Sequence, residues 1–442
     1  MVQPAMRLCA AAFLAVVATG LAGAVSAHAV PVSSDPSPGS DLATAPTNVV
    51  MIFSEAPDSK LSSITVLDGS GAVVSIGTAV PVPGLANGLR VTLVPLNRGV
   101  YTVAWRAISA VDAHLATGSF VFGVGTAPPH DSVQVTRRSI GDALSVPIGA
   151  IAGRWLLYAG LFVLLGSAFV GNLIYATPPR VTLQLATVAL VASVIGLALV
   201  VWVQGSDAGV GPIALLGTSI GRAVLIRAAP LLIAGVAIAA QMRTWQPTVR
   251  GMGVVGVAAA GALLADAATS HAAAAVSHAG GHPPHLDVLV QWIHVSAAGA
   301  WLGGLVVLLA CLRGQPTDES SRIARRFAVS AMIGISVVAT TGVVRALTEI
   351  GSLENLVTTD FGRLLVAKSA LLVALAALGA INHFRSVPAA GRRLRPLRRV
   401  GGTELAVGAI VLLFSASLVN LAPPADTPRT VVTEAAAARA AP

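Results

Sequence analysis

A histidine that becomes an amino terminus is the residue with the most distinctive chemistry in this chain. Residues 1–27 have the features of a secretory signal: a positive start at Arg7, an apolar stretch, and a small-residue cleavage site at Val25-Ser26-Ala27. Cleavage there exposes His28, whose α-amine and imidazole can chelate one ion. Nitrogen-rich, tetragonal coordination of this kind suits Cu(II). Cleavage after Ala29 would instead remove His28, and the sequence leaves both positions open.

A carboxylate and a second imidazole follow in Asp112-Ala113-His114. If this turn is extended, residues two apart project to the same side, so both side chains can bind one ion. Together with His28 they would supply three nitrogens and one oxygen to Cu(II). The alternative is an ordinary turn, in which Asp112 caps the backbone and His114 is solvated.

Composition places most of the chain in a membrane. Of 442 residues, 55% are hydrophobic and only 11% are charged, which is far from soluble-protein composition. The formal charge of +9 comes from Arg residues in short loops between apolar segments, a topology signal that argues against nucleic-acid binding. Of the two cysteines, Cys9 lies in the signal and Cys311 in an apolar segment, so neither a disulfide framework nor a thiolate metal site is expected.

The region before residue 125 has the pattern of a small antiparallel sandwich or barrel. Turn signals are expected at Asp68-Gly69, Asn87-Gly88 and Asn97-Arg98-Gly99. Segments rich in β-branched and aromatic residues alternate with them: Val49–Phe53, Ile64–Leu67, Arg90–Val94, Tyr101–Ser109 and Ser119–Val124.

Eight apolar segments then have the length of membrane-spanning helices. They are Val146–Leu173, Val181–Val203, Arg222–Gln241, Gly251–Thr269, Leu286–Leu312, Phe327–Leu347, Gly362–His383 and Thr403–Leu421. Arg residues are concentrated in the loops expected inside, which agrees with an exported N-terminal domain. We therefore expect a multi-pass protein of the cell (inner) membrane with its N-terminal domain on the periplasmic or extracellular side.

Within the fifth segment a polar stripe contains Asp287, Gln291 and His294. Such a stripe should face the bundle interior or a water-filled path. His294 is either a packed core histidine or a copper ligand. The preceding loop carries His271, His278, His282 and His285, which either collect metal or are solvated. A membrane copper path through His271, His294 and Asp287 is one prediction.

Other ionisable residues in or near the membrane segments should form ion pairs, although the sequence does not show which. They are Arg154, Arg227, Asp266, Arg345, Lys368 and Glu404. Copper would have to be released and reduced to cross this bundle as Cu(I), which prefers soft ligands. Few sulfur ligands lie in or beside the bundle: Met242, Met252, Met332 and Cys311.

The N-terminal motifs resemble the CopC family of periplasmic copper-binding domains. The resemblance runs from residue 28 to 124 and rests on His28-Ala29-Val30, Ser34-Asp35-Pro36-Ser37-Pro38-Gly39, Trp105, Asp112-x-His114 and Gly118-Ser119-Phe120. It implies a cupredoxin-like β-sandwich whose Cu(II) ligands are His28, Asp112 and His114. The Met-rich Cu(I) loop of some members is missing, because Met51 is the single methionine of the mature domain.

The second half is similar to the CopD copper-resistance membrane proteins over roughly residues 143–424. The matching residues are Ser270-His271-Ala272, Trp292-x-His294, Trp301-x-Gly303-Gly304, Gly362-Arg363-x-Leu365, Lys368, Asn382, Glu404 and Pro423-Pro424. The order of the two halves is similar to that of known CopC–CopD fusions.

These observations predict a multidomain chain: an all-β cupredoxin-like or Ig-like sandwich followed by an α-helical polytopic membrane bundle. The expected boundaries are a signal at 1–27, the sandwich at 28–126, a linker at 127–142, the eight-helix domain at 143–424 and a disordered tail at 425–442. The predicted function is Cu(II) capture outside the membrane and copper uptake, homeostasis or resistance. The alternatives are a membrane-anchored copper sensor or store, and a copper-dependent oxidative enzyme. A non-enzymatic role is the main prediction, with the copper ion and the lipid bilayer as partners and no chaperone identified.

Overall fold

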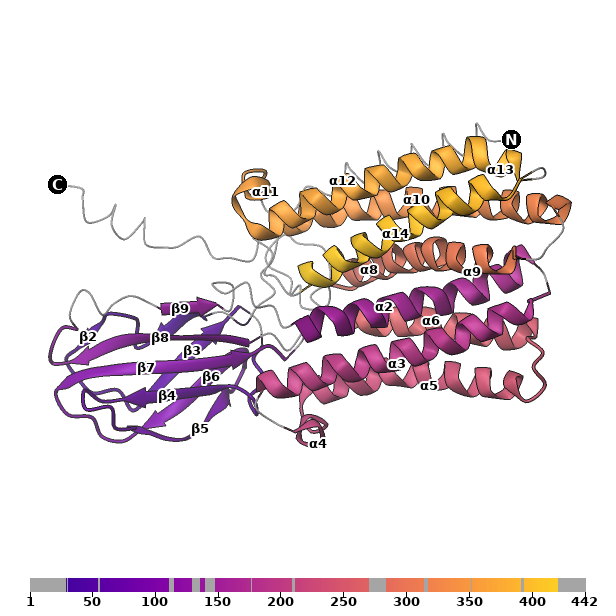
Figure 1. Cartoon of the computed structure of the whole chain (residues 1–442). Helices are drawn as coiled ribbons and strands as arrows, with labels where there is room; N and C mark the ends of the chain where they lie inside the picture. Colours follow the sequence, from indigo (N-terminus) through magenta and orange to yellow (C-terminus); the bar gives the residue numbers. More distant parts are fainter. Residues whose placement is uncertain are drawn as a thin grey trace.

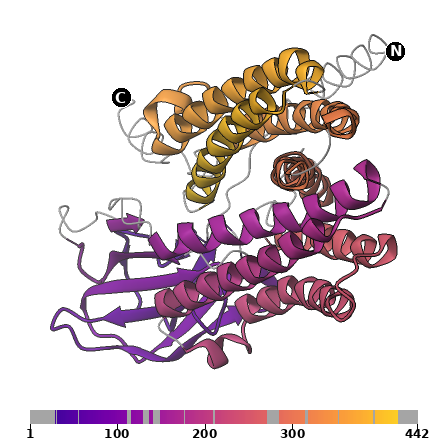
Figure 2. The same ribbon diagram turned by 45° about the vertical axis from the view of Figure 1, so that its right-hand side comes forward.

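The computed structural model describes most of the chain, from Ala29 to Val419. The described residues are 29, 31–54, 56–110, 115–128, 136–139, 148–175, 177–208, 211–269, 284–313, 317–350, 352–390 and 393–419. An N-terminal β-sandwich lies at one end of a bundle of long helices in both views (Figures 1 and 2). The predicted fold class, a sandwich followed by a helical membrane bundle, is confirmed.

The sandwich consists of two facing sheets. One has the strand order β1-β3-β6-β5, and the other has the order β2-β8-β7-β4 with β9 also paired to β8. All pairs are antiparallel except β2 with β8. The strands are β1 Pro31–Asp35, β2 Asp41–Leu42, β3 Asn48–Phe53, β4 Ser63–Leu67, β5 Ser75–Val82, β6 Leu85–Leu93, β7 Gly99–Ile108, β8 Leu115–Val124 and β9 Thr136–Ser139.

Alternate side chains of these strands fill one core. Every second residue of β3 is buried, which is the period-two pattern of a strand with one face inward. The rings of Phe53 on β3 and Trp105 on β7 meet edge to face with centroids 6.1 Å apart, and so join the two sheets. Met51 is 0% exposed, so its sulfur is a packing group and not a surface copper ligand.

Two features of the sandwich differ from the sequence pattern. Asn87 and Gly88 lie inside β6, so the turn predicted there is wrong; the reversal comes earlier, at Gly84, whose φ of +79° favours glycine. The Asn87 side chain instead donates to the Phe53 carbonyl at 2.5 Å, which ties β6 to the end of β3. Strand β9 lies within the segment expected to be a linker and adds to the edge of β8.

Eight helical spans in the described residues are long and apolar enough to cross a membrane, as predicted. The helices are α2 Ile148–Phe169, α3 Arg180–Ala208, α4 Pro212–Leu215, α5 Ser219–Met242, α6 Val249–Ala268, α8 Pro284–Ala298, α9 Gly304–Cys311, α10 Thr317–Ile350, α11 Asn355–Thr358, α12 Asp360–Ile381, α13 Val387–Ala389 and α14 Arg395–Leu418. Three π-helical segments continue α2, α8 and α12: η3 Val170–Ile174, η4 Gly299–Gly303 and η5 Asn382–Ser386. Large apolar side chains such as Trp202 and Val236 point outward, as expected for a surface in contact with lipid.

Glycines allow the central helices to approach closely. A Cβ atom built on Gly303 would lie 1.8 Å from the Phe162 carbonyl oxygen of α2, and one built on Gly166 would lie 2.2 Å from the Gly303 carbonyl carbon. Only glycine fits at such a crossing. The Trp301-Leu302-Gly303-Gly304 motif therefore packs η4 and the start of α9 against α2.

Candidate functional site

The three predicted outer copper ligands, His28, Asp112 and His114, lie outside the described residues. Their flanking residues are placed. Ala29, next to His28, is buried in the sandwich core, and Pro31 pairs with Phe53 at the end of β3. The segment that follows His28 is therefore held near the end of β3.

The β7–β8 connection, which carries Asp112 and His114, begins and ends at the same end of the sandwich. Ile108 pairs with Leu115 across its base. The Ala110 amide donates to the Ala56 carbonyl at 3.0 Å, and Ala56 follows the end of β3 by three residues. The segments flanking His28 and the Asp112-x-His114 motif therefore lie at one end of the sandwich.

This end of the sandwich is docked on the helical bundle through Asp58. Its carboxylate accepts hydrogen bonds from the Ser219 hydroxyl at 2.6 Å and the Ser219 amide at 3.0 Å, in the first turn of α5. Lys60 Nζ donates to the Gly217 carbonyl at 2.9 Å. The positive end of the α5 dipole favours an acidic side chain at this position.

Burial alone would raise the pKa of Asp58. Hydrogen bonds from the Ser219 hydroxyl and amide and from the Lys60 amide outweigh that effect, so the pKa lies below its ordinary value. The carboxylate is therefore the form that the docked structure stabilises.

An apolar cluster surrounds this polar contact. Leu61 and Ile108 of the sandwich are buried against Leu215 and Ile220 of the bundle, with Leu115 partly buried beside them. Ile108 and Leu115 are the two ends of the β7–β8 connection. The predicted copper-binding loop is thus anchored at both ends where the sandwich meets α4 and α5.

In the membrane bundle, His294 is half-buried and contacts α10. Its Nδ1 lies 2.8 Å from the Thr341 hydroxyl on α10, and that hydroxyl donates its own hydrogen to the Val337 carbonyl at 2.6 Å. With the Thr341 hydrogen used in this way, Nδ1 is the donor to Thr341 and Nε2 is the nitrogen of the neutral ring that carries the lone pair. Metal-binding histidines are commonly oriented in this way by their second nitrogen.

The other residues of the predicted membrane path do not join His294 in one site. Asp287 lies seven residues earlier on α8, about 10 Å along the helix axis, which is too far for both to bind one ion. His271 lies outside the described residues. Across the described part of the chain, no group of three or more His, Cys, Asp or Glu side chains could hold a metal ion.

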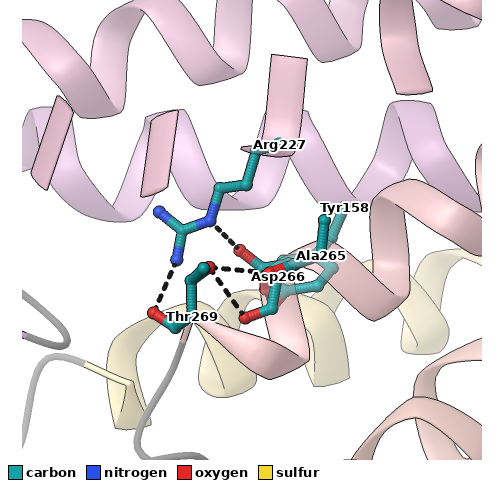
Figure 3. A network of polar contacts seen from close by, with 5 residues as sticks. All are labelled: Tyr158, Arg227, Ala265, Asp266 and Thr269. Carbon is teal, nitrogen blue, oxygen red and sulfur yellow. Dashed lines mark hydrogen bonds and ion pairs between the residues drawn. The ribbon is translucent and has the colours of Figure 1, made fainter. Parts of the chain in front are cut away.

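A separate ionic network joins α2, α5 and α6 (Figure 3). Arg227 Nε lies 3.0 Å from Asp266 Oδ1, and the Tyr158 hydroxyl donates to Asp266 Oδ2. The guanidinium also donates to the Thr269 carbonyl at 3.1 Å, at the end of α6. The network explains why a carboxylate is tolerated within the fourth apolar segment, because a charge in the membrane must be paired.

Two further polar residues of the bundle also find partners. Arg345 forms an ion pair with Glu349 one turn later on α10. Glu404 of α14 accepts a hydrogen bond from the Asn382 amide at 2.9 Å, and both side chains are buried. The expectation of ion pairing is confirmed for Arg227 with Asp266 and for Arg345 with Glu349, whereas Glu404 contacts a neutral amide.

Sequence reasoning did not find the docking residues. Asp58 and Ser219 are 161 positions apart, and each alone resembles a surface turn residue. A weak signal was present in Thr218-Ser219, because hydroxyl residues before an apolar helix are typical of its first turn.

Comparison with known proteins identifies both halves. The CopC domain model matches residues 31–125, and the model of copper resistance protein D, CopD, matches residues 321–418. The copper transport protein CutJ of Bacillus subtilis (strain 168) is 27% identical over 424 residues, covering 91% of this chain and 76% of its own length. The inner membrane protein YebZ of Escherichia coli (strain K12) is 30% identical over 138 residues, covering 30% of this chain and 47% of YebZ.

Solved structures also match the N-terminal domain. The crystal structure of CopC from Methylosinus trichosporium OB3b is 29% identical, covers 22% of this chain and 93% of its own length, and has a TM-score of 0.21. The chain thus contains a CopC domain at residues 31–125 and a CopD region at residues 321–418 of its membrane domain. The sequence resemblances to both families are confirmed, and with eight apolar spans the chain is a multi-pass membrane protein.

Proposed function

We propose that this protein captures Cu(II) outside the membrane and passes copper inward through its helical domain. The observation that carries the proposal is a single relative, a copper transport protein, whose similarity covers 91% of the chain and runs through both domains. Because the binding domain and the membrane domain align together to one copper transport protein, their similarity supports a shared role in copper transport. The family descriptions name copper resistance and copper transport, and no reaction.

The proposed outer ligands are the amine and ring of His28, with Asp112 and His114. Two observations support them: the segments next to these residues lie at the same end of the sandwich, and the donor set matches the preference of Cu(II) for nitrogen and oxygen in tetragonal geometry. The set requires a mature chain that begins at His28.

The interface between the sandwich and the bundle supports a transfer of copper from the first to the second. Asp58 and the Leu61–Ile108 contact hold the ends of the β7–β8 connection against α4 and the start of α5. Copper released from that loop would be released beside the helix ends and not into bulk solvent.

The proposed orientation places the sandwich outside. The sandwich contacts the start of α5, whereas Arg243 and Arg250 lie between the end of α5 and the first turn of α6, at the opposite end of the bundle. Basic loops stay on the cytoplasmic side. Cleavage of the signal after Ala27 belongs to the same proposal.

Copper flux into vesicles reconstituted with the full-length protein tests the proposal. Wild type should take up copper, and His114→Ala should lower both Cu(II) affinity and uptake from dilute copper. A chain with one extra residue before His28 should lose affinity in the same way, because the displaced amine can no longer chelate with the His28 ring.

Three outcomes would contradict parts of this proposal. Unchanged affinity in both variants would overturn the ligand assignment. Cu(II) binding without any flux would favour the anchored sensor or store. Oxygen consumption by the copper-loaded protein would favour the oxidative enzyme.

A further inference from the structure

A cavity of about 40 Å³ lies between helices of the bundle, where α12 ends and α14 begins. These helix ends are the ones farther from the sandwich (Figure 1). The cavity is lined by residues of η4, α9, α10, α12, η5, α13 and α14, and a volume of this size holds an ion or a few waters. Most of its lining is apolar. Four side chains with atoms able to bind a cation also line it: Met332, Asn382, His383 and Glu404.

Two of these side chains have buried polar atoms without a partner among the described residues. They are Asn382 Oδ1 and His383 Nδ1. Asn382 is only 7% exposed, and its amide nitrogen is already used by Glu404. An unpaired buried acceptor destabilises the fold, and such atoms are frequent where a ligand completes the site.

Glu404 is the third side chain with a buried polar group that could bind a cation, and it is 3% exposed. Within the described part of the chain it has no ion-pair partner, because its carboxylate contacts only the neutral Asn382 amide. A buried carboxylate without a counter-charge is costly. A cation in the cavity would remove that cost.

Met332 determines which cation fits. Thioether and imidazole ligands select Cu(I) over the hard cations that prefer oxygen alone. Of the sulfur-containing residues named in the bundle, Met332 lines this cavity. Met252 is packed in a different apolar cluster, and Cys311 lies in the apolar cluster that borders the cavity without lining it.

We propose that this cavity is a Cu(I)-binding site in the membrane, with Met332, His383, Asn382 and Glu404 as its ligands. The inference rests on the proposed function, because copper is the substrate already assigned to the chain. Cu(II) captured outside must gain one electron before it binds here, and an external thiol reductant would supply it, with two thiols forming one disulfide and releasing two protons for every two Cu(II) ions reduced. It adds a binding site in the helical domain, distinct from the outer Cu(II) site and from His294.

The local helix geometry supports this assignment. Two of the three π-helical segments supply cavity residues: η4 contributes Trp301, and η5 contributes Asn382 and His383. Single π-turns inside α-helices are frequent at functional sites, because the extra residue leaves backbone and side chains in unusual directions. Trp301 follows His294 by seven residues on one continuous span, so about 10 Å of helix separates His294 from the cavity wall.

X-ray absorption on full-length protein loaded with Cu(I) under reducing conditions tests the site directly. The copper spectrum of wild type should contain a sulfur neighbour. Met332→Leu should remove that neighbour and weaken Cu(I) binding by roughly tenfold or more. Met252→Leu is the matched control, since Met252 is fully buried away from the cavity, and it should keep both.

Uptake of copper supplied as Cu(I) by reconstituted vesicles tests the role of Glu404. Glu404→Gln keeps the size of the side chain and an acceptor for Asn382, so the helices should stay packed while uptake falls roughly tenfold or more. Glu319→Gln changes an exposed carboxylate near the start of α10 and should transport like wild type.

The two arms separate failure of this site from failure of the transport function. If wild type takes up copper and both Met332→Leu and Glu404→Gln bind and transport equally well, the cavity site is overturned. If wild type shows the sulfur neighbour but no uptake, the Cu(I) site stands and the transport proposal fails. A wild-type spectrum without sulfur, or one unchanged in Met332→Leu, would reject Met332 as a ligand.

Discussion

Two carboxylates of the membrane domain, the partly buried Asp266 and the buried Glu404, are held in opposite ways. Asp266 lies 3.0 Å from the Arg227 guanidinium and also accepts the Tyr158 hydroxyl. Glu404 has one neutral amide at 2.9 Å and borders a cavity. A carboxylate saturated by the protein's own cation is part of the scaffold. A carboxylate without such a partner can bind a transported cation. The presence or absence of an ion-pair partner therefore separates a structural carboxylate from a cation-binding one, although both are acidic residues.

Removing the partner of Asp266 should have the largest effect on stability. Arg227→Met leaves the carboxylate buried without its charge partner and should lower the free energy of unfolding by about 3–5 kcal/mol. Denaturant unfolding of the purified protein measures this. Arg222→Met, at an exposed position of the same helix, is the control.

The double variant Arg227→Met/Asp266→Leu should recover most of that loss, because an apolar pair avoids the cost of burying charge. If Arg227→Met alone is as stable as wild type, Asp266 does not depend on this ion pair and the comparison with Glu404 loses its basis.

The two carboxylates should also differ when each is made neutral. Asp266→Asn leaves the partly buried Arg227 without a counter-charge and should cost several kcal/mol, on the order of 3–5. Glu404→Gln keeps an acceptor for Asn382 and removes an uncompensated charge, so it should cost less than about 1 kcal/mol. Equal losses in the same unfolding assay would show that both carboxylates are structural.

Asp58 extends the comparison to a carboxylate held by neutral donors outside the membrane. Since its pKa lies below the ordinary value of 3.8, the docked state stabilises the carboxylate form. That stabilisation is fully present above the ordinary pKa and is lost as the pH falls through the lowered pKa. The docking should therefore be unchanged from neutral pH down to about pH 5 and weaken only in stronger acid.

Spin-label distances between the sandwich and α5 measure the docking. Asp58→Asn should broaden the distance distribution already at neutral pH. Asp68→Asn is a matched control: the pKa of Asp68 is also lowered, chiefly by the Ser70 side chain, but this exposed turn contacts only its own loop through the bonds described. Equal broadening in both variants would argue against a specific Asp58 contact.

The smallest effect is expected at Lys60. Its bond to the Gly217 carbonyl is exposed to solvent, so Lys60→Ala should change the free energy of unfolding by less than about 0.5 kcal/mol and leave the spin-label distances unchanged. A larger effect would mean that the docking depends on the exposed cation and not on the buried Asp58 contact.

The sequence predicted those helices and strands whose pattern of apolar residues is local. The eight spans follow from apolar length alone, and strands such as β3 and β7 follow from alternation of buried residues. Strand β5 was not found because most of its residues are exposed and its pattern does not alternate. The turn expected at Asn87-Gly88 failed because Gly84, just before β6, makes the reversal.

The functional residues also divide into those with a local sequence signal and those without one. The outer ligands were proposed from a motif and from the chemistry of an N-terminal histidine, and they stay a prediction. The place of His383 beside the cavity depends on the π-turn of η5, which no residue pattern in Asn382–Ser386 indicates. The docking contact joins residues 161 positions apart and is visible only in three dimensions.

The bond from Ser219 to Asp58 also bears on how the protein is made. Asp58 is synthesised 161 residues before Ser219, so the acceptor for the first turn of α5 already exists when that helix is made. The sandwich, which is synthesised first, thus supplies a hydrogen-bond acceptor for the first turn of α5 in the bundle. A membrane domain expressed without its sandwich would begin α5 with that amide unpaired and Leu215 and Ile220 uncovered, and so would be a poorer folding unit than its own eight spans suggest.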